Sequence, residues 1–135
     1  MDIDRLIPHR PPFRFVDEVV RVDPESGEFL LNLSATDPRL STGRLAPLLV
    51  VEALAQAAAA FHGASQCSGG PETGMLVQLA EVKLMAAAAA NDRVSLRVTR
   101  SHTLGDLVRF IGQATVNGRS LVSAELTVAR QRGES

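Results

Sequence analysis

Apolar and polar residues alternate along much of this chain. In 93–99 the apolar side chains of Val94, Leu96 and Val98 alternate with polar or charged neighbours. A period of two is typical of a β-strand that buries one face, because successive side chains of a strand point to opposite sides. The same pattern, cleaner in some segments than in others, predicts strands over 13–22, 28–35, 74–85, 107–116 and 120–129.

Turn residues separate these predicted strands. Asn117–Gly118 lies between two alternating apolar runs, which is the strongest short-range signal for a β-hairpin. The segment 23–27, with Asp, Pro, Ser and Gly, has the chemistry of a second hairpin turn. The alanine run 86–90 is left unassigned, because its composition favours a helix while its position follows a strand.

A different pattern occupies 47–63, which reads PLLVVEALAQAAAAFHG. Strong helix formers fill this segment, Pro47 suits a first helical turn, and Gly63 stands where a left-handed cap is expected. The predicted helix is apolar nearly all round, so it should be buried on most sides. Its apolar stretch is interrupted by Glu52 and Gln56 and is expected to be too short to span a bilayer.

The predicted elements follow the order strand, strand, helix and then four strands, with an irregular loop over 36–46 before the helix. A long sheet curled around one apolar helix buries the circumference of the helix and the inner face of the sheet. We therefore expect an α+β protein with a single domain over residues 1–135, a length that suits one hydrophobic core.

Composition narrows the classes of function. There are five Phe but no Trp or Tyr, so the core must be aliphatic, and a net charge of -1 offers no general attraction to nucleic acid or to an anionic membrane. No motif has the spacing of a metal site, and no glycine loop of the phosphate-binding or dinucleotide-binding kind occurs, so we expect neither metal nor cofactor. The lone Cys67 and the lack of an apolar signal core at the N-terminus indicate a soluble cytoplasmic protein.

Three segments resemble the FabZ-type 3-hydroxyacyl-(acyl carrier protein) dehydratases. Residues 6–19 (LIPHRPPFRFVDEV) are similar to the opening of that family, 48–61 (LLVVEALAQAAAAF) to its central helix, and 107–129 to its last hairpin. The three segments run in the family's order over nearly the whole chain. The resemblance implies a hotdog fold, in which a curled antiparallel sheet of about six strands wraps around one long buried helix.

The resemblance also implies an activity and partners. Members of this family dehydrate 3-hydroxyacyl thioesters on acyl carrier protein in fatty acid or polyketide synthesis, and they form dimers, or trimers of dimers, through edge strands. We therefore expect a thioester of a carrier protein or of coenzyme A as substrate. We also expect a homodimer or higher hotdog oligomer, with a heterodimer with another dehydratase as the alternative, because assembly closes exposed sheet edges.

Two positions depart from the family pattern. The family's histidine lies in a Gly-His-Phe-Pro-Gly segment before the helix, and the corresponding position here is Pro38. A glycine whose backbone N–H polarises the thioester carbonyl is replaced by Pro47, which has no N–H to donate. The usual base and one usual carbonyl donor are therefore missing from their places. A sub-branch of the family linked to aryl polyene pathways, which this chain also resembles, lacks the histidine segment too.

Dehydration of a 3-hydroxyacyl thioester needs a base for the α-proton, an acid for the departing hydroxyl and donors for the carbonyl. Glu52 is the candidate acid, and on an apolar helix we expect it to be desolvated, which favours its neutral form. Gln56, one turn later on the same face, is expected to orient Glu52 or to bind the substrate hydroxyl. The alternative is that the two residues form a polar network in the core without a catalytic task.

Three histidines are available as a base. His9 lies in the family-like Pro-His-Arg motif, where the usual role is structural, and it remains the weaker catalytic candidate. His62 suits the negative C-terminal end of the helix without a catalytic task, and His102 is expected to be a solvated residue beside the turn at 103–106. A partner chain is a further source of the base.

Five arginines are the candidate contacts for an acidic carrier protein near a substrate tunnel, although ordinary solvated side chains explain them equally well: Arg5, Arg10, Arg14, Arg39 and Arg44. Three hypotheses for the whole chain follow. It is a dehydratase with an unconventional base, or a non-catalytic or half-site hotdog subunit that binds acyl chains or pairs with an active dehydratase. The third hypothesis is an acyl thioesterase in which Glu52 activates water, although Pro47 counts against it.

Overall fold

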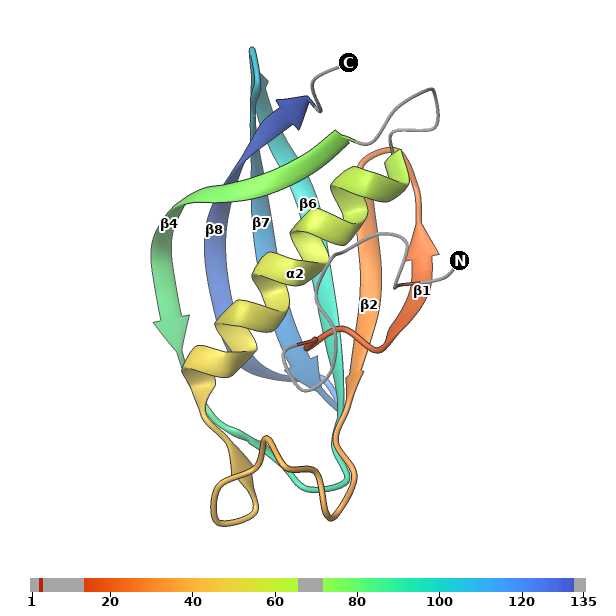
Figure 1. Cartoon of the computed structure of the whole chain (residues 1–135). Helices are drawn as coiled ribbons and strands as arrows, with labels where there is room; N and C mark the ends of the chain where they lie inside the picture. The colour runs from red at the N-terminus through yellow and green to blue at the C-terminus, as the bar shows by residue number, and fades with distance from the viewer. Residues whose placement is uncertain (1–2, 4–13, 66–71, 133–135) are drawn as a thin grey trace.

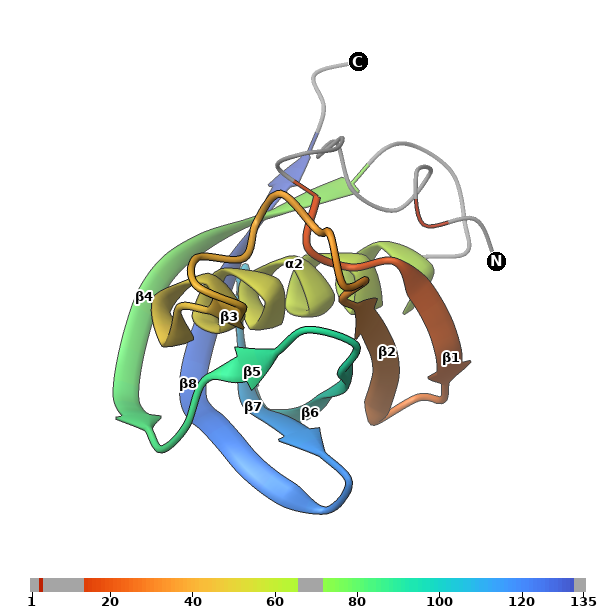
Figure 2. The ribbon, with the colours of Figure 1, turned by 90° about the horizontal axis from the view of Figure 1, so that it is seen from below.

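The computed structural model describes residue 3, residues 14–65 and residues 72–132. Within these residues a six-stranded sheet, ordered β1-β2-β6-β7-β8-β4, curls around the long helix α2 (Figures 1 and 2). Every pair of neighbouring strands is antiparallel. The bounds are β1 Glu18–Val22, β2 Ser26–Asn32, α2 Pro47–Ser65, β4 Glu72–Leu84, β6 Arg93–Leu104, β7 Leu107–Val116 and β8 Arg119–Arg132. The predicted α+β architecture, with one long helix inside a curled sheet, is confirmed.

The core lies between α2 and the inner face of the sheet. The alternation predicted for β6 is observed, since Val94, Leu96 and Val98 are fully buried. Across the core, the ring of Phe61 on α2 meets the ring of Phe110 on β7 edge to face, with centroids 5.5 Å apart. Such aromatic contacts add to the burial of aliphatic area, so α2 is held by the sheet along its length.

Both predicted hairpins are present. At the turn between β7 and β8, Asn117 and Gly118 have φ values of 51° and 80°, as a two-residue type I′ turn requires. At the turn between β1 and β2, Oδ1 of Asp23 accepts hydrogen bonds from the backbone N–H groups of Glu25 and Ser26, at 3.2 and 2.9 Å. Local side-chain chemistry therefore sets both turns.

Several predicted boundaries are wrong. The strand predicted over 93–99 continues to Leu104, and the strand predicted over 28–35 spans Ser26–Asn32. The helix continues through Gly63 to Ser65, and Gly63 is not among the residues with positive φ, because glycine also tolerates ordinary helical angles. The first strand begins at Glu18, several residues after its predicted start. Phe15 and Val16 are buried there without being part of a strand. Apolar side chains can thus be buried by a segment that pairs with no strand.

A second, very small sheet is present that no pattern in the sequence indicates. β3 (Arg44–Leu45) pairs with β5 (Ala88–Ala89), so the predicted loop 36–46 and the unassigned alanine run meet. Leu45 and Ala88 are both fully buried. This contact lies near the N-terminal end of α2 (Figure 2). It fixes the connection that leads into the helix.

The expectation that the apolar stretch of α2 is too short to span a bilayer is wrong. By length and composition alone, the window Pro47–Ala64 would be able to cross a membrane, and 61% of that window is buried inside the molecule. A core helix of a globular domain passes the same test, and here the curled sheet covers it (Figure 2).

Candidate active site

Two polar side chains project from the middle of α2, Glu52 and Gln56, one turn apart. Nε2 of Gln56 donates a hydrogen bond of 3.3 Å to Oε1 of Glu52. Gln56 is 1% exposed, whereas Glu52 is exposed. The expectation that Glu52 is desolvated is therefore wrong for the single chain. The reason is that Glu52 shares the stripe of α2 that faces away from the sheet with Leu48, which is 69% exposed.

A backbone group fixes the orientation of Gln56. The N–H of Phe15 donates to Oε1 of Gln56 at 2.7 Å, inside the core. Because the amide oxygen accepts from Phe15, the amide nitrogen is the end that faces Glu52. The prediction that Gln56 orients Glu52 thus has a structural basis, while its predicted contact with substrate stays a prediction.

The loop between β2 and β3 carries an ion pair where the family has its histidine. Asp37 and Arg39 flank the exposed Pro38. Nε and Nη2 of Arg39 donate to the two carboxylate oxygens of Asp37, at 2.9 and 2.7 Å. The hydrogen bond from Arg39 holds the pKa of Asp37 below its ordinary value, and the pKa of Arg39 is raised by the same contact. Sequence reasoning missed this pair, whose sole signal is two opposite charges two positions apart.

The predicted arginine group is in part an internal network. Nη2 of Arg14 and Nη2 of Arg39 lie 3.8 and 3.9 Å from the carboxylate of Asp17, so both charges have a nearby carboxylate. Arg44 is exposed on β3. Arg14 and Arg39 therefore stabilise the fold locally, and a docking role for the group stays a prediction. Outside the described residues lie the other two, Arg5 and Arg10.

The two histidines among the described residues, His62 and His102, do not lie near the helix carboxyl. His9 lies outside the described residues, so its candidacy as a base stays a prediction. His62 is 1% exposed near the end of α2, about 15 Å along the helix axis from Glu52 at 1.5 Å per residue. His102 is exposed near the end of β6, as predicted, and it lines a hollow on the outer face of the sheet. The candidate bases for Glu52 are therefore His9 and a group from a partner chain, as the sequence predicts.

Pro47 has no N–H, but another residue in the first turn of α2 has a backbone N–H that is able to donate to a substrate carbonyl. The N–H groups of Leu49 and Val50 donate to the carbonyl oxygen of Ala46, at 2.9 and 3.4 Å. Within the described residues this leaves the N–H of Leu48 as the first-turn donor without a hydrogen bond. Leu48 precedes Glu52 by one helical turn, so donor and carboxyl lie on the same side of α2.

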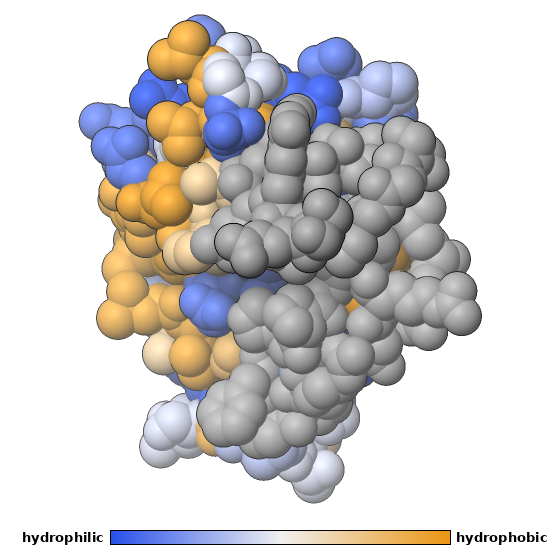
Figure 3. Space-filling view, turned by 45° about the horizontal axis from the view of Figure 1, so that its top comes forward, coloured by the Kyte–Doolittle hydropathy of each residue, from blue (hydrophilic) through white to orange (hydrophobic). Residues whose placement is uncertain are grey.

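The side of the molecule next to this stripe is apolar. β4 ends the sheet, so its outer edge pairs with no strand in the described part of the chain. Met75 to Leu79 are consecutive exposed residues of β4, so side chains on both faces of this part of the strand reach solvent. Figure 3 shows apolar side chains gathered on the side where Figure 1 places β4. The exposed apolar residues on and just after β4, here called the β4 patch, are Met75, Leu76, Val77, Leu79, Val82, Leu84 and Met85.

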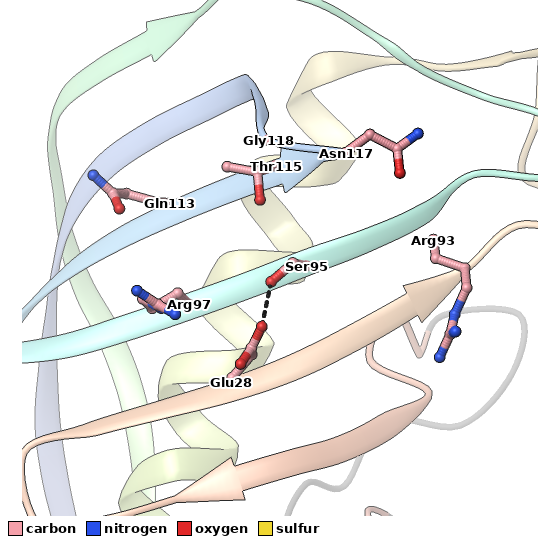
Figure 4. Close-up of a pocket in the computed structure, with 8 residues that line it drawn as sticks. All are labelled: Glu28, Arg93, Ser95, Arg97, Gln113, Thr115, Asn117 and Gly118. Carbon is pink, nitrogen blue, oxygen red and sulfur yellow. Dashed lines mark hydrogen bonds between the residues drawn. The ribbon is translucent and has the colours of Figure 1, made fainter.

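Two open hollows lie on the outer face of the sheet, away from Glu52. The first, of about 330 Å³, is polar, and in it Oγ of Ser95 donates to Oε1 of Glu28 at 2.9 Å (Figure 4). Its side chains stand in front of the sheet and α2 lies behind it. The second, of about 340 Å³, is lined by Gln78, His102, Thr103, Leu104, Leu107, Arg109 and Thr127. We place the candidate site at Glu52, because neither hollow contains an oriented acid on the helix.

The described residues contain no evident set of metal ligands. No group of three or more His, Cys, Asp or Glu side chains among them could hold a metal ion.

Comparisons with known proteins find similarity to dehydratases. Residues 1–134 match the family described as ApeP-like, ApeP dehydratase. The 3-hydroxyacyl-[acyl-carrier-protein] dehydratase FabZ of Klebsiella pneumoniae is 34% identical over 142 aligned positions, covering 97% of this chain and 91% of that protein. FabZ of Agrobacterium fabrum is 25% identical over 133 positions, covering 93% of this chain and 85% of that protein.

Solved structures give the fold independently. The dehydratase heterocomplex ApeI:P from Xenorhabdus doucetiae contains a chain that superposes with a TM-score of 0.85 at 20% identity, covering 98% of this chain and 92% of that one. A hypothetical thioesterase with coenzyme A from Streptococcus pneumoniae has a TM-score of 0.71 at 12% identity, with coverage of 87% and 88%. At these identities the likeness shows the hotdog fold and no particular activity.

Proposed function

Because the chain belongs to the ApeP-like dehydratase family, we propose that it is one subunit of a 3-hydroxyacyl-thioester dehydratase whose active site is completed by a second hotdog chain. In this site Glu52 is the general acid. The substrate is a 3-hydroxyacyl chain on acyl carrier protein, as in the names of the FabZ relatives.

The observation that carries this proposal is the position of Glu52. Its carboxyl is oriented by the buried Gln56 and yet exposed in the single chain. The stripe of α2 that carries Glu52 lies near an unpaired sheet edge with a band of apolar side chains. Apolar patches of this kind mark protein–protein contacts, and an exposed sheet edge is a template for pairing with another chain. A partner on the β4 patch would cover Glu52 and supply the desolvation that this chain does not.

The reaction at such a site can be written with its protons. A base on the partner removes the proton at C2 of the thioester, and the electron pair moves toward the carbonyl. The C3–O bond then breaks while Glu52 gives its proton to the departing hydroxyl, which leaves as water. The product is a 2-enoyl thioester. Return of the abstracted proton from the base to Glu52, directly or through water, restores the starting state.

We assign the base to a partner chain because neither of the described histidines lies near Glu52. Pro38 replaces the family's histidine, and the two described histidines lie near the end of α2 and on the outer face of the sheet. A dehydratase heterocomplex is the subject of the structural neighbour from Xenorhabdus doucetiae, which is a precedent for two different hotdog chains in one assembly. His9 remains the alternative base from within the chain.

The thioester carbonyl needs a donor as it gains enolate character, and Pro47 cannot provide one. The N–H of Leu48 is the group in the first turn of α2 that is open to this role. It also benefits from the positive end of the helix dipole, which favours developing negative charge. The chain would thus contribute an acid and a carbonyl donor, and the partner would contribute the base.

The experiment that tests this proposal compares three preparations by the ultraviolet absorbance of a 2-enoyl thioester: this chain alone, a hotdog dehydratase from the same genome alone, and the two co-expressed. We expect a stable mixed complex that hydrates the enoyl thioester faster than either chain alone. If this chain forms a strict homodimer that hydrates the substrate unaided, a partner of different sequence is not needed, and the base lies in this chain or in the second copy of it. Release of free thiol without enoyl chemistry would instead indicate a thioesterase.

A further inference from the structure

One peptide group near the start of the described chain is held at both of its polar ends. It is the bond between Arg14 and Phe15. Its oxygen, on Arg14, accepts a hydrogen bond of 2.8 Å from Nη1 of Arg39. Its N–H, on Phe15, donates to Oε1 of Gln56 at 2.7 Å. This single peptide therefore connects the loop after β2 with the centre of α2.

The connection continues to the candidate acid, because Nε2 of Gln56 donates to Oε1 of Glu52 at 3.3 Å. The Arg39–Glu52 series, as we call it, runs from the guanidinium through the backbone peptide and the side-chain amide to the carboxyl. Each amide accepts at its oxygen and donates at its nitrogen. A donor on the oxygen of an amide polarises the group and strengthens its N–H as a donor, so the two links act in the same direction.

The origin of the series is itself fixed. The guanidinium of Arg39 is bound by both oxygens of Asp37, and its Cζ lies 5.5 Å from the centre of the Phe15 ring. The side chains of Arg39 and Asp37 are 13% and 9% exposed. A planar guanidinium held by two parallel hydrogen bonds and an aromatic face keeps a single orientation. Nη1 is thereby directed at the peptide oxygen of Arg14, while Nη2 also donates to the carbonyl oxygen of Asn32 at 3.4 Å.

We propose that Arg39 is a positioning residue for Glu52 and acts through the Arg14–Phe15 peptide and Gln56. The loop that carries the histidine in related dehydratases would then still serve the site in this chain, by orienting the acid instead of supplying a base. The inference rests on the proposed function for the role of Glu52. The geometry of the series itself does not depend on that role.

The first test measures the hydrogen bonds of the Arg39–Glu52 series in the absence of substrate. In Arg39→Met, which keeps a long side chain beside Phe15 but removes every donor, hydrogen exchange of the Phe15 amide should become about tenfold faster relative to that of the Val98 amide in the middle of β6. The side-chain NH₂ resonances of Gln56 should shift as well. The control is Arg21→Gln, which removes an arginine that pairs with an aspartate two positions away, Asp23, at the β1–β2 turn. Unchanged exchange at Phe15 in Arg39→Met would overturn the proposal.

The second test asks whether Arg39 acts through Gln56. In the active assembly, Arg39→Met should lower kcat for enoyl hydration about tenfold while KM changes less than about twofold, because orientation of the acid matters in the transition state. In a Gln56→Leu background the same substitution should have almost no further effect on kcat. Additive losses, or a loss confined to KM, would contradict a role through Gln56.

A third variant distinguishes a positioning role of Arg39 from a general loss of folding. Arg39→Lys retains a cation and one donor and should be intermediate in both readouts, because lysine cannot reproduce the guanidinium fork. If the wild-type assembly shows no enoyl hydration at all, the proposed function fails. The exchange measurements then still decide whether the series exists.

Discussion

Gln56 lies between a backbone donor and a carboxyl, and it donates through Nε2 to Oε1 of Glu52 over 3.3 Å. Its own oxygen accepts the Phe15 N–H at 2.7 Å, so the amide has one orientation in which both contacts are made. Gln56 is buried and Glu52 is exposed. The pair thus joins the core of the domain to a surface where chemistry can take place.

Gln56→Leu should cost stability as well as activity. Leucine fills a similar volume but leaves the buried N–H of Phe15 without its acceptor, and an orphaned buried donor costs about 1 to 3 kcal/mol. We expect the free energy of unfolding to fall by about that amount in urea denaturation. Gln113→Leu, at an exposed position of β7, is the matched control and should change stability by less than about 0.5 kcal/mol. Equal effects of the two substitutions would show that the buried contact is unimportant.

The Asp37–Arg39 pair predicts a dependence of stability on pH. The hydrogen bond from Arg39 lowers the pKa of Asp37 below 3.8, so the ionised carboxylate stabilises the folded state. This contribution is fully present above the unfolded value and is lost as the pH falls through the lowered folded value. Asp37→Asn should therefore reduce the free energy of unfolding at pH 7 by about 1 to 3 kcal/mol and make little difference near pH 2.

The control for that experiment is Asp106→Asn, at an exposed position of the turn between β6 and β7. Its stability relative to wild type should stay nearly constant across the same pH range. A difference between wild type and Asp37→Asn that is as large at pH 2 as at pH 7 would contradict an electrostatic origin.

Gly112 on β7 leaves room for the side chain of Leu126 on β8, beside Leu54 of α2. A Cβ at this position would stand 2.8 Å from Cδ1 of Leu126 and 3.4 Å from both δ-carbons of Leu54 on the helix. Gly112→Ala should therefore lower the free energy of unfolding by about 1 to 3 kcal/mol, as overpacking does in well-packed cores. Gln113→Ala, at an exposed position of the same strand, is the control and should change stability by less than about 0.5 kcal/mol. A stable Gly112→Ala would mean that the side chain of Leu126 can shift at little cost.

The β4 patch should govern assembly. Leu79→Lys puts a charge on the edge strand and should shift the assembly toward monomer, measured by size-exclusion chromatography with light scattering. Ile111→Lys is a matched control on the outer face of β7, because Leu79 and Ile111 are 41% and 43% exposed. Identical masses for the two variants and wild type would place the interface elsewhere.

The sequence predicted those elements that local chemistry dictates. Alternation of apolar residues predicted β6 and β7, Asn117–Gly118 predicted the hairpin after β7, and the apolar run after Pro47 predicted α2. These signals work because each element has a fixed side-chain period and because a type I′ turn needs residues that accept positive φ. Gly63 misled the boundary of the helix, because glycine permits a cap without requiring one.

The remaining features depend on contacts between distant segments. Nothing local indicates that Arg39 reaches the peptide oxygen of Arg14, or that the Phe15 N–H binds Gln56, since these partners are brought together only when the loop, the lead-in to β1 and the helix pack. The exposure of Glu52 was also misjudged. An apolar helix implies burial, but it does not say which stripe is left for another chain to cover.

The most direct measurement is the rate of enoyl thioester hydration by the complete assembly with Glu52→Gln in place of the wild-type chain, followed by ultraviolet absorbance. Glutamine keeps the shape of the side chain but cannot exchange a proton as a carboxyl does. The account predicts a loss of about 10² to 10⁴ in kcat with unchanged assembly, while the matched control Glu125→Gln on β8 keeps wild-type activity. Activity of the Glu52→Gln assembly within about twofold of wild type would contradict the assignment of Glu52 as the acid.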